Sequence, residues 1–245
     1  KIIDVVADKT VEILSYFEID AGNMKPYSQL LIDANEALGK MNVTYEQLIL
    51  ELKRSNERME MLAIELQTAN EKLRELATKD GLTGLYNHRY FQEALEKEIN
   101  RSLRNKTPLS LVLLDIDDFK SINDQYGHPV GDIVLKGIAD ALQKTVRDSD
   151  LLARYGGEEF SVILPETDLK GGAMLAERLR RAVEAEETTT EAYSIQTTIS
   201  LGVTTYAPST GNRGMAEFII AADKGLYHSK ETGKNKISLV NMSTG

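Results

Sequence analysis

Two groups of acidic residues in this chain could together bind a metal ion and a phosphate. Residues 154–160 read Arg-Tyr-Gly-Gly-Glu-Glu-Phe between two apolar runs, so two flexible glycines present Glu158 and Glu159 at the tip of a predicted β-hairpin. Upstream, an apolar stretch of the buried-strand type ends in Asp115, with Asp117 and Asp118 directly after it. Mg²⁺ prefers hard oxygen ligands that leave some coordination positions to water and phosphate. If the two elements are neighbours in the fold, Asp115 and a hairpin glutamate could hold Mg²⁺ against a triphosphate.

Each group also has a plainer interpretation when it is taken alone. A Gly-Gly pair such as Gly156-Gly157 occurs in ordinary hairpin turns, and an aspartate cluster after a strand can cap a solvated helix. The glycines need no room for a side chain, however, so a nucleotide could approach the backbone closely there. The presence of both groups in one chain favours the binding site.

The pattern after residue 78 alternates between helical and strand-like segments. We predict helices over residues 87–104, 119–125, 130–146, 170–187 and 214–232. The predicted strands cover residues 109–116, 151–155, 159–164, 194–206 and 236–240. This order indicates an α+β domain with a mixed central sheet that is flanked by helices.

Residues 45–78 contain no glycine or proline and repeat an apolar position at alternating spacings of four and three residues. The seam positions are Leu48, Leu52, Ser55, Met59, Leu62, Leu66, Ala69, Leu73 and Leu76. Because the positions between them are mostly polar, a single helix would leave this stripe exposed, and we expect it to pair with a second copy as a parallel coiled coil. The alternative is an amphipathic helix that packs on its own domain.

We therefore divide the chain into three predicted parts. Residues 1–44 are the helical remnant of an upstream regulatory region, 45–78 a coiled-coil dimerisation stalk, and 79–245 a catalytic domain. A helix is expected over residues 1–22, and Pro26 begins a second one that could run into the stalk. Because the first residue is Lys1 rather than Met, we expect the chain to be a piece of a longer protein, with the helix over residues 1–22 as the end of a missing sensory domain.

The composition excludes several classes of function. A formal charge of −9 argues against wrapping nucleic acid, which calls for a basic face, although a nucleotide bound through Mg²⁺ stays possible because the cation reverses the local sign. The chain has no cysteine, which removes disulfides, cysteine-bound zinc and thiol nucleophiles and fits a reducing compartment. No run approaches the roughly 20 apolar residues of a membrane span. We expect a cytoplasmic protein.

Five motifs carry a resemblance to a known family. They are Asp80-Gly-Leu-Thr-Gly-Leu-Tyr-Asn-His-Arg89, Asp115-Ile-Asp-Asp-Phe-Lys-Ser-Ile-Asn123, Tyr126-Gly-His-Pro-Val-Gly-Asp132, Arg154-Tyr-Gly-Gly-Glu-Glu-Phe160 and Tyr227-His-Ser-Lys-Glu-Thr-Gly-Lys-Asn235. In this order and spacing, from about residue 78 to 240, the chain resembles the GGDEF family of diguanylate cyclases, with glutamate at the variable third position of the signature. The resemblance implies a fold like the palm of nucleotidyl cyclases and polymerases, here preceded by a long coiled-coil helix.

Carried over by motif position, the resemblance also implies a set of site residues. The Mg²⁺ ligands, with Mn²⁺ as a possible substitute, would be Asp115, the carbonyl of Ile116 and Glu158, with Glu159 beside them. The nucleotide would lie near Gly156 and Gly157, and its triphosphate would contact the backbone amides around Asp118 and Phe119 together with Lys120, Lys230 and Lys234. The family often has arginine where this chain has Lys234, and a lysine there keeps the charge but loses the bidentate fork.

The implied reaction joins two GTP molecules. The 3′-hydroxyl of one GTP attacks the α-phosphate of another, pyrophosphate leaves, and a second round closes cyclic di-GMP. Asn123 and Asp132 fall on the guanine-recognition positions, where an ionised aspartate accepts two N–H groups that adenine does not offer. Glu158 or Glu159 could take the proton, and a metal-activated hydroxide is the alternative base. Each domain would bind one GTP, so two domains must face each other across a homodimer.

A second site is implied by Arg147-Asp-Ser-Asp150, which stands at the spacing of the inhibitory RxxD motif of the family. Arg178, on the following predicted helix, would add a second guanidinium. Arginine can bind both phosphate and a guanine edge, so these residues would capture the product cyclic di-GMP and lower activity. The plainer alternative is a surface salt bridge.

Two rival functions stay open from the sequence. The first is a catalytically inactive module that senses GTP or cyclic di-GMP and signals through the coiled coil. Such modules usually have damaged acidic motifs, whereas Asp115, Glu158 and Glu159 are all present here. The second is a pure interaction protein in which the stalk acts and the globular part is inert.

Overall fold

The computed structural model describes residues 25–190, 193–206 and 214–241, together with Val6, residues 8–10 and Glu12. The chain divides into two compact units, Lys1–Asn70 and Glu71–Gly245. Most of the helix predicted over residues 1–22 lies outside the described residues. Within the described part, no helix combines the length and the apolar character that crossing a membrane requires.

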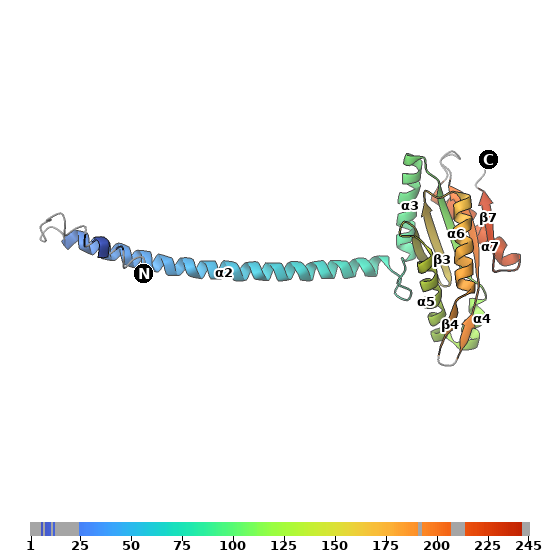
Figure 1. Cartoon of the computed structure of the whole chain (residues 1–245), viewed down its shortest axis with the longest axis horizontal. Coiled ribbons are helices and arrows are strands. Elements are labelled where there is room, and N and C mark those ends of the chain that lie inside the picture. The colour runs from blue at the N-terminus through green and yellow to red at the C-terminus, as the bar shows by residue number, and fades with distance from the viewer. Residues whose placement is uncertain are drawn as a thin grey trace. The chain divides into compact units, whose positions relative to one another are not determined.

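Helix α2 (Lys25–Thr78) forms most of the first unit and its last turns belong to the second (Figure 1). The second predicted helix therefore does run into the stalk without a break. The seam leucines of residues 48–76 are exposed along the single chain. The same spacing continues upstream at Tyr45, Met41, Leu38, Ala34, Leu31 and Tyr27. Nothing in the described helix marks the predicted boundary between residues 44 and 45.

The second unit is built on a five-stranded sheet in the order β2-β3-β1-β6-β7. The strands are β1 (Leu109–Ile116), β2 (Leu151–Gly156), β3 (Glu159–Pro165), β6 (Ile199–Tyr206) and β7 (Ile237–Asn241). Strand β1 lies in the centre and pairs antiparallel with β3 and β6, whereas β6 and β7 run parallel. The predicted mixed sheet is confirmed, and its centre is strand β1, which carries Asp115 one residue before its end.

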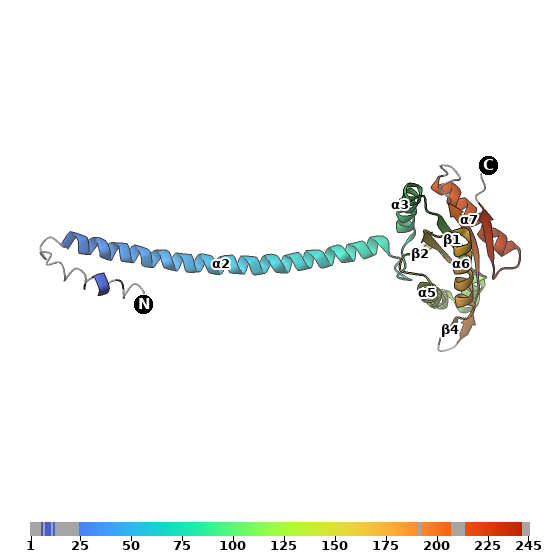
Figure 2. The same cartoon turned by 45° about the horizontal axis from the view of Figure 1, so that its top comes forward.

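Helices cover both faces of this sheet (Figure 2). Helices α4 (Phe119–Tyr126), α5 (His128–Thr145) and α6 (Leu169–Glu184) lie on one face, and α3 (His88–Asn105) and α7 (Met215–Glu231) on the other. Strand β1 is buried on both faces: Val112, Leu114 and Ile116 pack with the first group, and Leu109, Leu111 and Leu113 with the second. Because side chains alternate along a strand, Asp115 shares the α3/α7 face with Leu113.

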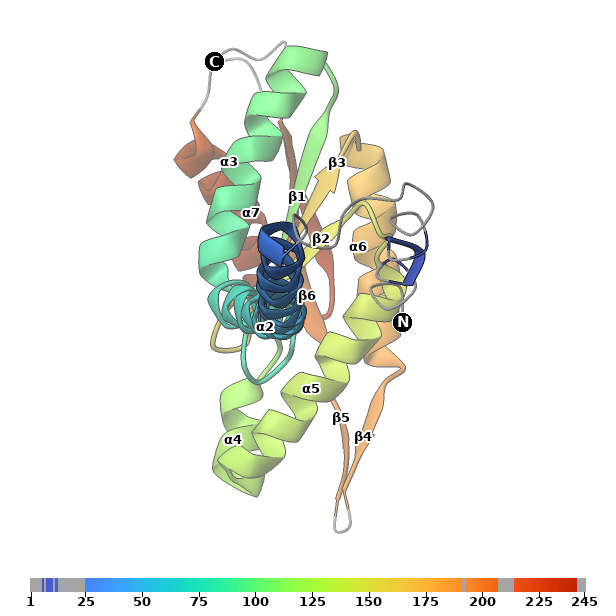
Figure 3. The same cartoon turned by 90° about the vertical axis from the view of Figure 1, so that its left-hand side faces the viewer.

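Two predicted elements differ from the structure. The helix predicted over 170–187 ends at Glu184, because Thr188 and Thr189 are β-branched and lie in strand β4 (Glu187–Thr189), which pairs with β5 (Ser194–Gln196). The strand predicted over 194–206 is split between β5 and β6, since Thr197 and Thr198 leave the sheet to bind Asp117. Figure 3 shows the β4–β5 hairpin extending past the end of the main sheet, with α4 beside α5.

Candidate active site

The end of β1 and the last turn of α7 bring opposite charges together. The ammonium Nζ of Lys230 lies 2.5 Å from Oδ1 of Asp115 and 2.9 Å from the carbonyl oxygen of Ile116. The two oxygens that the sequence predicted as metal ligands therefore converge on one cation. Burial raises the pKa of Asp115 and the nearby Asp117 carboxylate adds to the rise, while Lys230 acts in the opposite direction.

The hairpin places its second glutamate across from Asp115. Strand register pairs Asp115 with Glu159, so the two side chains lie on the same face of the sheet. Burial raises the pKa of Glu159, and the carboxylates of Asp115, Asp223 and Glu158 raise it further. Glu158 itself lies in the turn, where its carbonyl accepts a hydrogen bond of 3.3 Å from the N–H of Ile116.

Asp117 is a structural residue rather than an open ligand. Its carboxylate accepts hydrogen bonds from the hydroxyls of Thr198 and Ser200 and from the backbone N–H of Asn235, at 2.6, 2.7 and 3.0 Å, and only 5% of the residue is exposed. Burial raises its pKa, but these hydrogen bonds and Lys230 outweigh burial and leave the pKa below the usual value. Asp117 thus joins the loop after β1 to β6 and to the loop after α7.

The loop after β1 also presents the predicted phosphate-binding groups. Asp118 has a left-handed backbone with φ of 56° and precedes the first turn of α4, which contains Phe119 and Lys120. Nζ of Lys234 lies 2.5 Å from Oδ1 of Asp118, and this carboxylate raises the pKa of Lys234. Lys120 is exposed, and none of the ion pairs found among the described residues includes it.

Asn123 lies against the start of α5 because α4 and α5 approach closely at a glycine. A Cβ atom at Gly131 would lie 2.0 Å from Oδ1 of Asn123 and 3.3 Å from the ring of Phe119. Gly131 is buried, while the neighbouring Asp132 is exposed in the second turn of α5. The sequence indicated the two polar residues Asn123 and Asp132, but not the glycine next to Asp132 that leaves room for the Asn123 side chain.

The turn of the hairpin is tied to the segment that follows the long helix. The guanidinium of Arg154 donates to the carbonyl of Gly157 from Nε and Nη2, at 2.9 and 2.7 Å, and from Nη1 to Asp80 at 3.1 Å. Asp80 also accepts from the backbone N–H and the hydroxyl of Thr83. Gly157 has φ of 49°, a conformation that glycine adopts without strain. Arg154 therefore fixes the backbone of the Gly-Gly turn.

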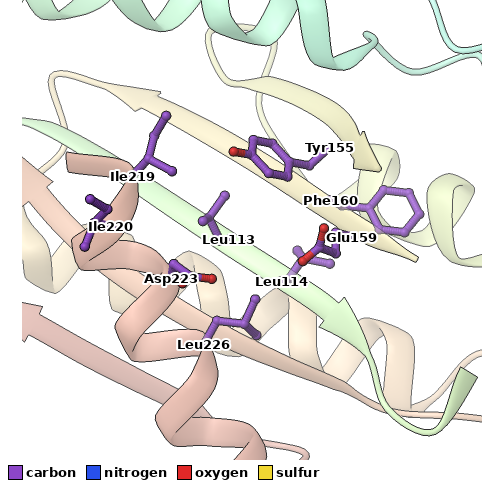
Figure 4. A pocket seen from close by; sticks show the side chains of 9 residues that line it. All are labelled: Leu113, Leu114, Tyr155, Glu159, Phe160, Ile219, Ile220, Asp223 and Leu226. Atoms are coloured by element: carbon purple, nitrogen blue, oxygen red, sulfur yellow. The ribbon is translucent and has the colours of Figure 1, made fainter. Parts of the chain in front are cut away.

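A pocket of about 210 Å³ opens beside Glu159, between the hairpin and α7 (Figure 4). Leucine and isoleucine side chains of β1 and α7 line most of it, and Glu159, Asp223 and Tyr155 add polar groups. Burial raises the pKa of Tyr155, and both carboxylates contribute to the rise. The sequence analysis missed Asp223, because only the packing of α7 on the sheet brings this residue near the hairpin.

The residues of the predicted inhibitory site also meet at one cavity. Arg147, Asp150 and Arg178 line a second cavity of about 110 Å³, together with residues of α6 and β3. The backbone N–H of Arg147 donates to the Asp150 carboxylate at 3.0 Å, and Nη2 of Arg178 donates to the carbonyl of Thr145 at 3.0 Å. This cavity lies on the α6 face, away from the face that carries Asp115 and Glu159.

The acidic side chains in the described part of the chain do not form a complete metal site by themselves. Among the residues that the structure describes, no three acidic or imidazole side chains gather closely enough to ligate one ion. A metal at the end of β1 would therefore use a backbone oxygen as well as carboxylates. The carbonyl of Ile116, which already contacts Lys230, supplies that type of ligand.

Curated proteins of several bacteria are similar to about two thirds of this chain. Diguanylate cyclase DgcP of Pseudomonas aeruginosa is 42% identical over 163 residues, which are 66% of this chain and 24% of that protein. Diguanylate cyclase A of Treponema denticola is 40% identical over 168 residues, 67% of this chain and 45% of that protein. The chain thus spans less than half the length of these relatives.

Solved structures show the same fold. The coiled coil and GGDEF domain of DgcB from Caulobacter crescentus, in complex with c-di-GMP, is 29% identical with a TM-score of 0.69 and covers 78% of this chain and 98% of that one. Diguanylate cyclase SiaD of Pseudomonas aeruginosa, in complex with its activator SiaC, is 30% identical with a TM-score of 0.65, covering 97% and 88% of the two chains. The family model "Diguanylate cyclase, GGDEF domain" matches residues 77–236. The chain therefore belongs to the family of diguanylate cyclase GGDEF domains.

Proposed function

We propose that this protein condenses two molecules of GTP into cyclic di-GMP and two pyrophosphates. The observation that carries this proposal is the convergence of Asp115, the Ile116 carbonyl and Lys230 at the end of β1, with Glu159 on the paired strand. A lysine can offset the charge of a triphosphate, and carboxylates beside it can hold the divalent cation that accompanies the triphosphate. Family membership supports the same chemistry.

The residues at the end of β1 fit a divalent cation, and we propose Mg²⁺ with Mn²⁺ as a substitute. Asp115, the Ile116 carbonyl and one hairpin glutamate would hold it, and the register favours Glu159 over the predicted Glu158 because Glu159 is paired with Asp115. When bound, the ion lowers the pKa of an attacking hydroxyl and offsets phosphate charge. Glu158, in the adjacent turn, then stands as the carboxylate that takes the proton from the 3′-hydroxyl.

Lysines at the same place act on the substrate rather than on the metal. Lys230 pairs with Asp115, and its ammonium would be available to the triphosphate when Asp115 holds a cation. Lys234 pairs with Asp118 through an exposed contact, which a phosphate can replace at little cost. With Lys120 and the first amides of α4, these groups stabilise the departing pyrophosphate.

The catalytic unit in this proposal is a dimer of residues 79–245 joined through the stalk, with residues 1–44 as the remnant of a regulatory region. Each domain offers one set of carboxylates and lysines, and two GTP molecules must meet. The exposed seam of α2 is suited to pairing with a second copy. Because its spacing continues to Tyr27, we propose that the coiled coil extends upstream of residue 45.

Incubation of the purified chain with GTP and Mg²⁺ tests the activity and the pairing together. Cyclic di-GMP and pyrophosphate should form in a ratio of one to two, with a rate per chain that rises with protein concentration. ATP in place of GTP serves as the control for guanine recognition. Binding of GTP without either product would favour the sensing module instead.

Gly131→Ala should weaken GTP binding without unfolding the domain. The new methyl group would clash with the end of the Asn123 side chain and lie 3.3 Å from the ring of Phe119, so the clash is relieved mainly by moving the Asn123 amide. We expect the KM for GTP to rise about tenfold, the effect of one lost hydrogen bond of about 1.4 kcal/mol. Gly137→Ala in the same helix is the matched control, since its nearest neighbour is the hydroxyl of Thr188 at 3.0 Å. Equal KM values for both variants would contradict this role of Gly131.

Arg147→Ala should reduce inhibition by the product. We propose that the cavity formed by Arg147, Asp150 and Arg178 binds cyclic di-GMP, because guanidinium groups bind phosphate through charged hydrogen bonds. Loss of one such contact, about 1.5–3 kcal/mol, should raise the half-inhibitory concentration of cyclic di-GMP about tenfold or more. Arg104→Ala, an exposed position on α3, is the control. An inhibition curve that does not move would exclude Arg147 from the inhibitory site.

A further inference from the structure

The loop between α7 and β7 holds a conformation that its residues do not favour by themselves. Gly233, Lys234 and Asn235 are three consecutive residues with positive φ, at 114°, 59° and 45°. Glycine tolerates this region, but lysine is strained there, and asparagine only partly avoids the cost. Contacts from outside the loop must therefore hold Lys234 and Asn235 in place.

Those contacts come from α6. Nη1 of Arg180 donates to Oδ1 of Asn235 at 2.7 Å, and Nδ2 of Asn235 donates to Glu184 at 2.7 Å. Arg180 is fixed in turn by Glu177, through Nε and Nη2 at 2.9 and 3.0 Å, and by Glu184. Its side chain is only 13% exposed, so this group of ion pairs is a fixed part of the fold and not a mobile surface pair.

The same asparagine connects α6 to the candidate active site. Its backbone N–H donates to Asp117, whose other carboxylate oxygen lies 3.1 Å from Nζ of Lys230. On its other side stands Lys234, whose ammonium reaches Asp118. Asn235 therefore fixes the backbone from which Lys234 extends.

We propose that Arg180 and Asn235 are positioning residues for the triphosphate end of the nucleotide. Arg180 holds the Asn235 side chain, and Asn235 keeps Lys234 in the left-handed conformation that aims its ammonium at the loop after β1. Neither residue needs to touch the substrate. This inference rests on the proposed function, because it takes Lys234 to be a phosphate ligand.

Arg180→Lys tests the inference, because it keeps the positive charge but cannot hold Glu177 and Asn235 together. We expect the KM for GTP to rise about three- to tenfold, as for the loss of one hydrogen bond, with kcat within about twofold. Backbone amides of residues 233–235 should exchange faster with deuterium. Arg181→Lys is the matched control, since Arg181 lies on the same helix, binds Glu177 and is 72% exposed.

A binding measurement separates this inference from the proposed activity. Calorimetry with Mg²⁺ and inorganic tripolyphosphate needs no turnover, and Arg180→Lys should weaken the affinity by the same factor. Asn235→Gly accepts positive φ but lacks the side-chain amide, so it should weaken the affinity for tripolyphosphate by the same factor. The double variant should bind no more weakly than either single variant.

Failure of the positioning role of Arg180 and failure of the phosphate role of Lys234 give different results. Wild-type affinity and unchanged amide exchange in Arg180→Lys, with weakened binding in Lys234→Ala, would overturn the positioning role while leaving the phosphate role of Lys234. Unchanged tripolyphosphate binding in Lys234→Ala would remove Lys234 from the proposed site, and the inference would fall with it. A fall in kcat without a change in KM would also contradict the inference.

Discussion

Asp115→Asn should lower the rate of cyclic di-GMP formation by about 10³-fold or more. The asparagine has nearly the same shape but no charge, so it loses the carboxylate that converges with the Ile116 carbonyl on one cation position. Product formation from GTP, followed by chromatography under saturating Mg²⁺, gives the rate. The same variant should also lose the part of GTP binding that depends on the metal.

The fold should survive this change, which makes the loss of activity interpretable. The pKa of Asp115 is raised in the folded protein, so its ionised form at neutral pH is less favourable there than in the unfolded chain. An asparagine removes that penalty and the repulsion from Glu159, but it also loses the ion pair with Lys230. The two effects on stability oppose each other. We expect the free energy of unfolding to change by about 1 kcal/mol or less. Asp140→Asn on α5 is the control, and a folded Asp115→Asn variant within tenfold of the wild-type rate would refute the site.

Local sequence patterns predicted the sheet and the acids at its edge. Strand β1 covers the predicted residues 109–116, because eight residues of apolar, strand-forming type can be recognised without their neighbours. The Gly-Gly pair likewise marked the hairpin turn, and the register then brings Glu159 to Asp115. The strand and the hairpin turn each depend on residues that are close in the sequence, and sequence patterns predict such local features best.

Local sequence patterns could not predict the different roles of the neighbouring acids Asp115 and Asp117. Asp115 and Asp117 are two residues apart, yet the first has a raised pKa and the second a lowered one. The difference arises from Thr198, Ser200 and Asn235, which lie more than eighty residues further along the chain. The split of the predicted strand 194–206 has the same origin, since Thr198 leaves the sheet to bind Asp117. Partners of this kind become visible only in the folded structure.

Three connections around the site also depend on tertiary packing. Arg154 ties the Gly-Gly turn to Asp80, which follows the last turn of α2 by two residues. Arg180 ties the Lys234 loop to α6. Gly131 lets Asn123 of α4 approach α5 next to Asp132. In each case a residue outside the reacting groups sets their place, so substitutions at these positions should act on substrate binding before they act on the chemical step.

Gly202→Ala should destabilise the domain more than any other glycine substitution considered above. A Cβ atom at Gly202 would lie 2.0 Å from the carbonyl oxygen of Ala222 and 2.2 Å from the backbone nitrogen of Leu226. Both are backbone atoms of α7, so no side-chain rotation can relieve the clash and the helix must move away from β6. Overpacking of this kind costs about 3 kcal/mol or more.

The displaced helix would carry Lys230 with it, one turn beyond Leu226, and Ser229, whose hydroxyl donates to the carbonyl of Leu201 at 2.8 Å. A variant that still folds should therefore also have a higher KM for GTP. Urea unfolding measures the stability, with Gly81→Ala as the control, because a Cβ atom there meets nothing within 4 Å. Gly81→Ala should stay within about 0.5 kcal/mol of the wild type. If Gly202→Ala unfolded at the same urea concentration as Gly81→Ala, the close contact between β6 and α7 would not be the feature that holds Lys230 against Asp115.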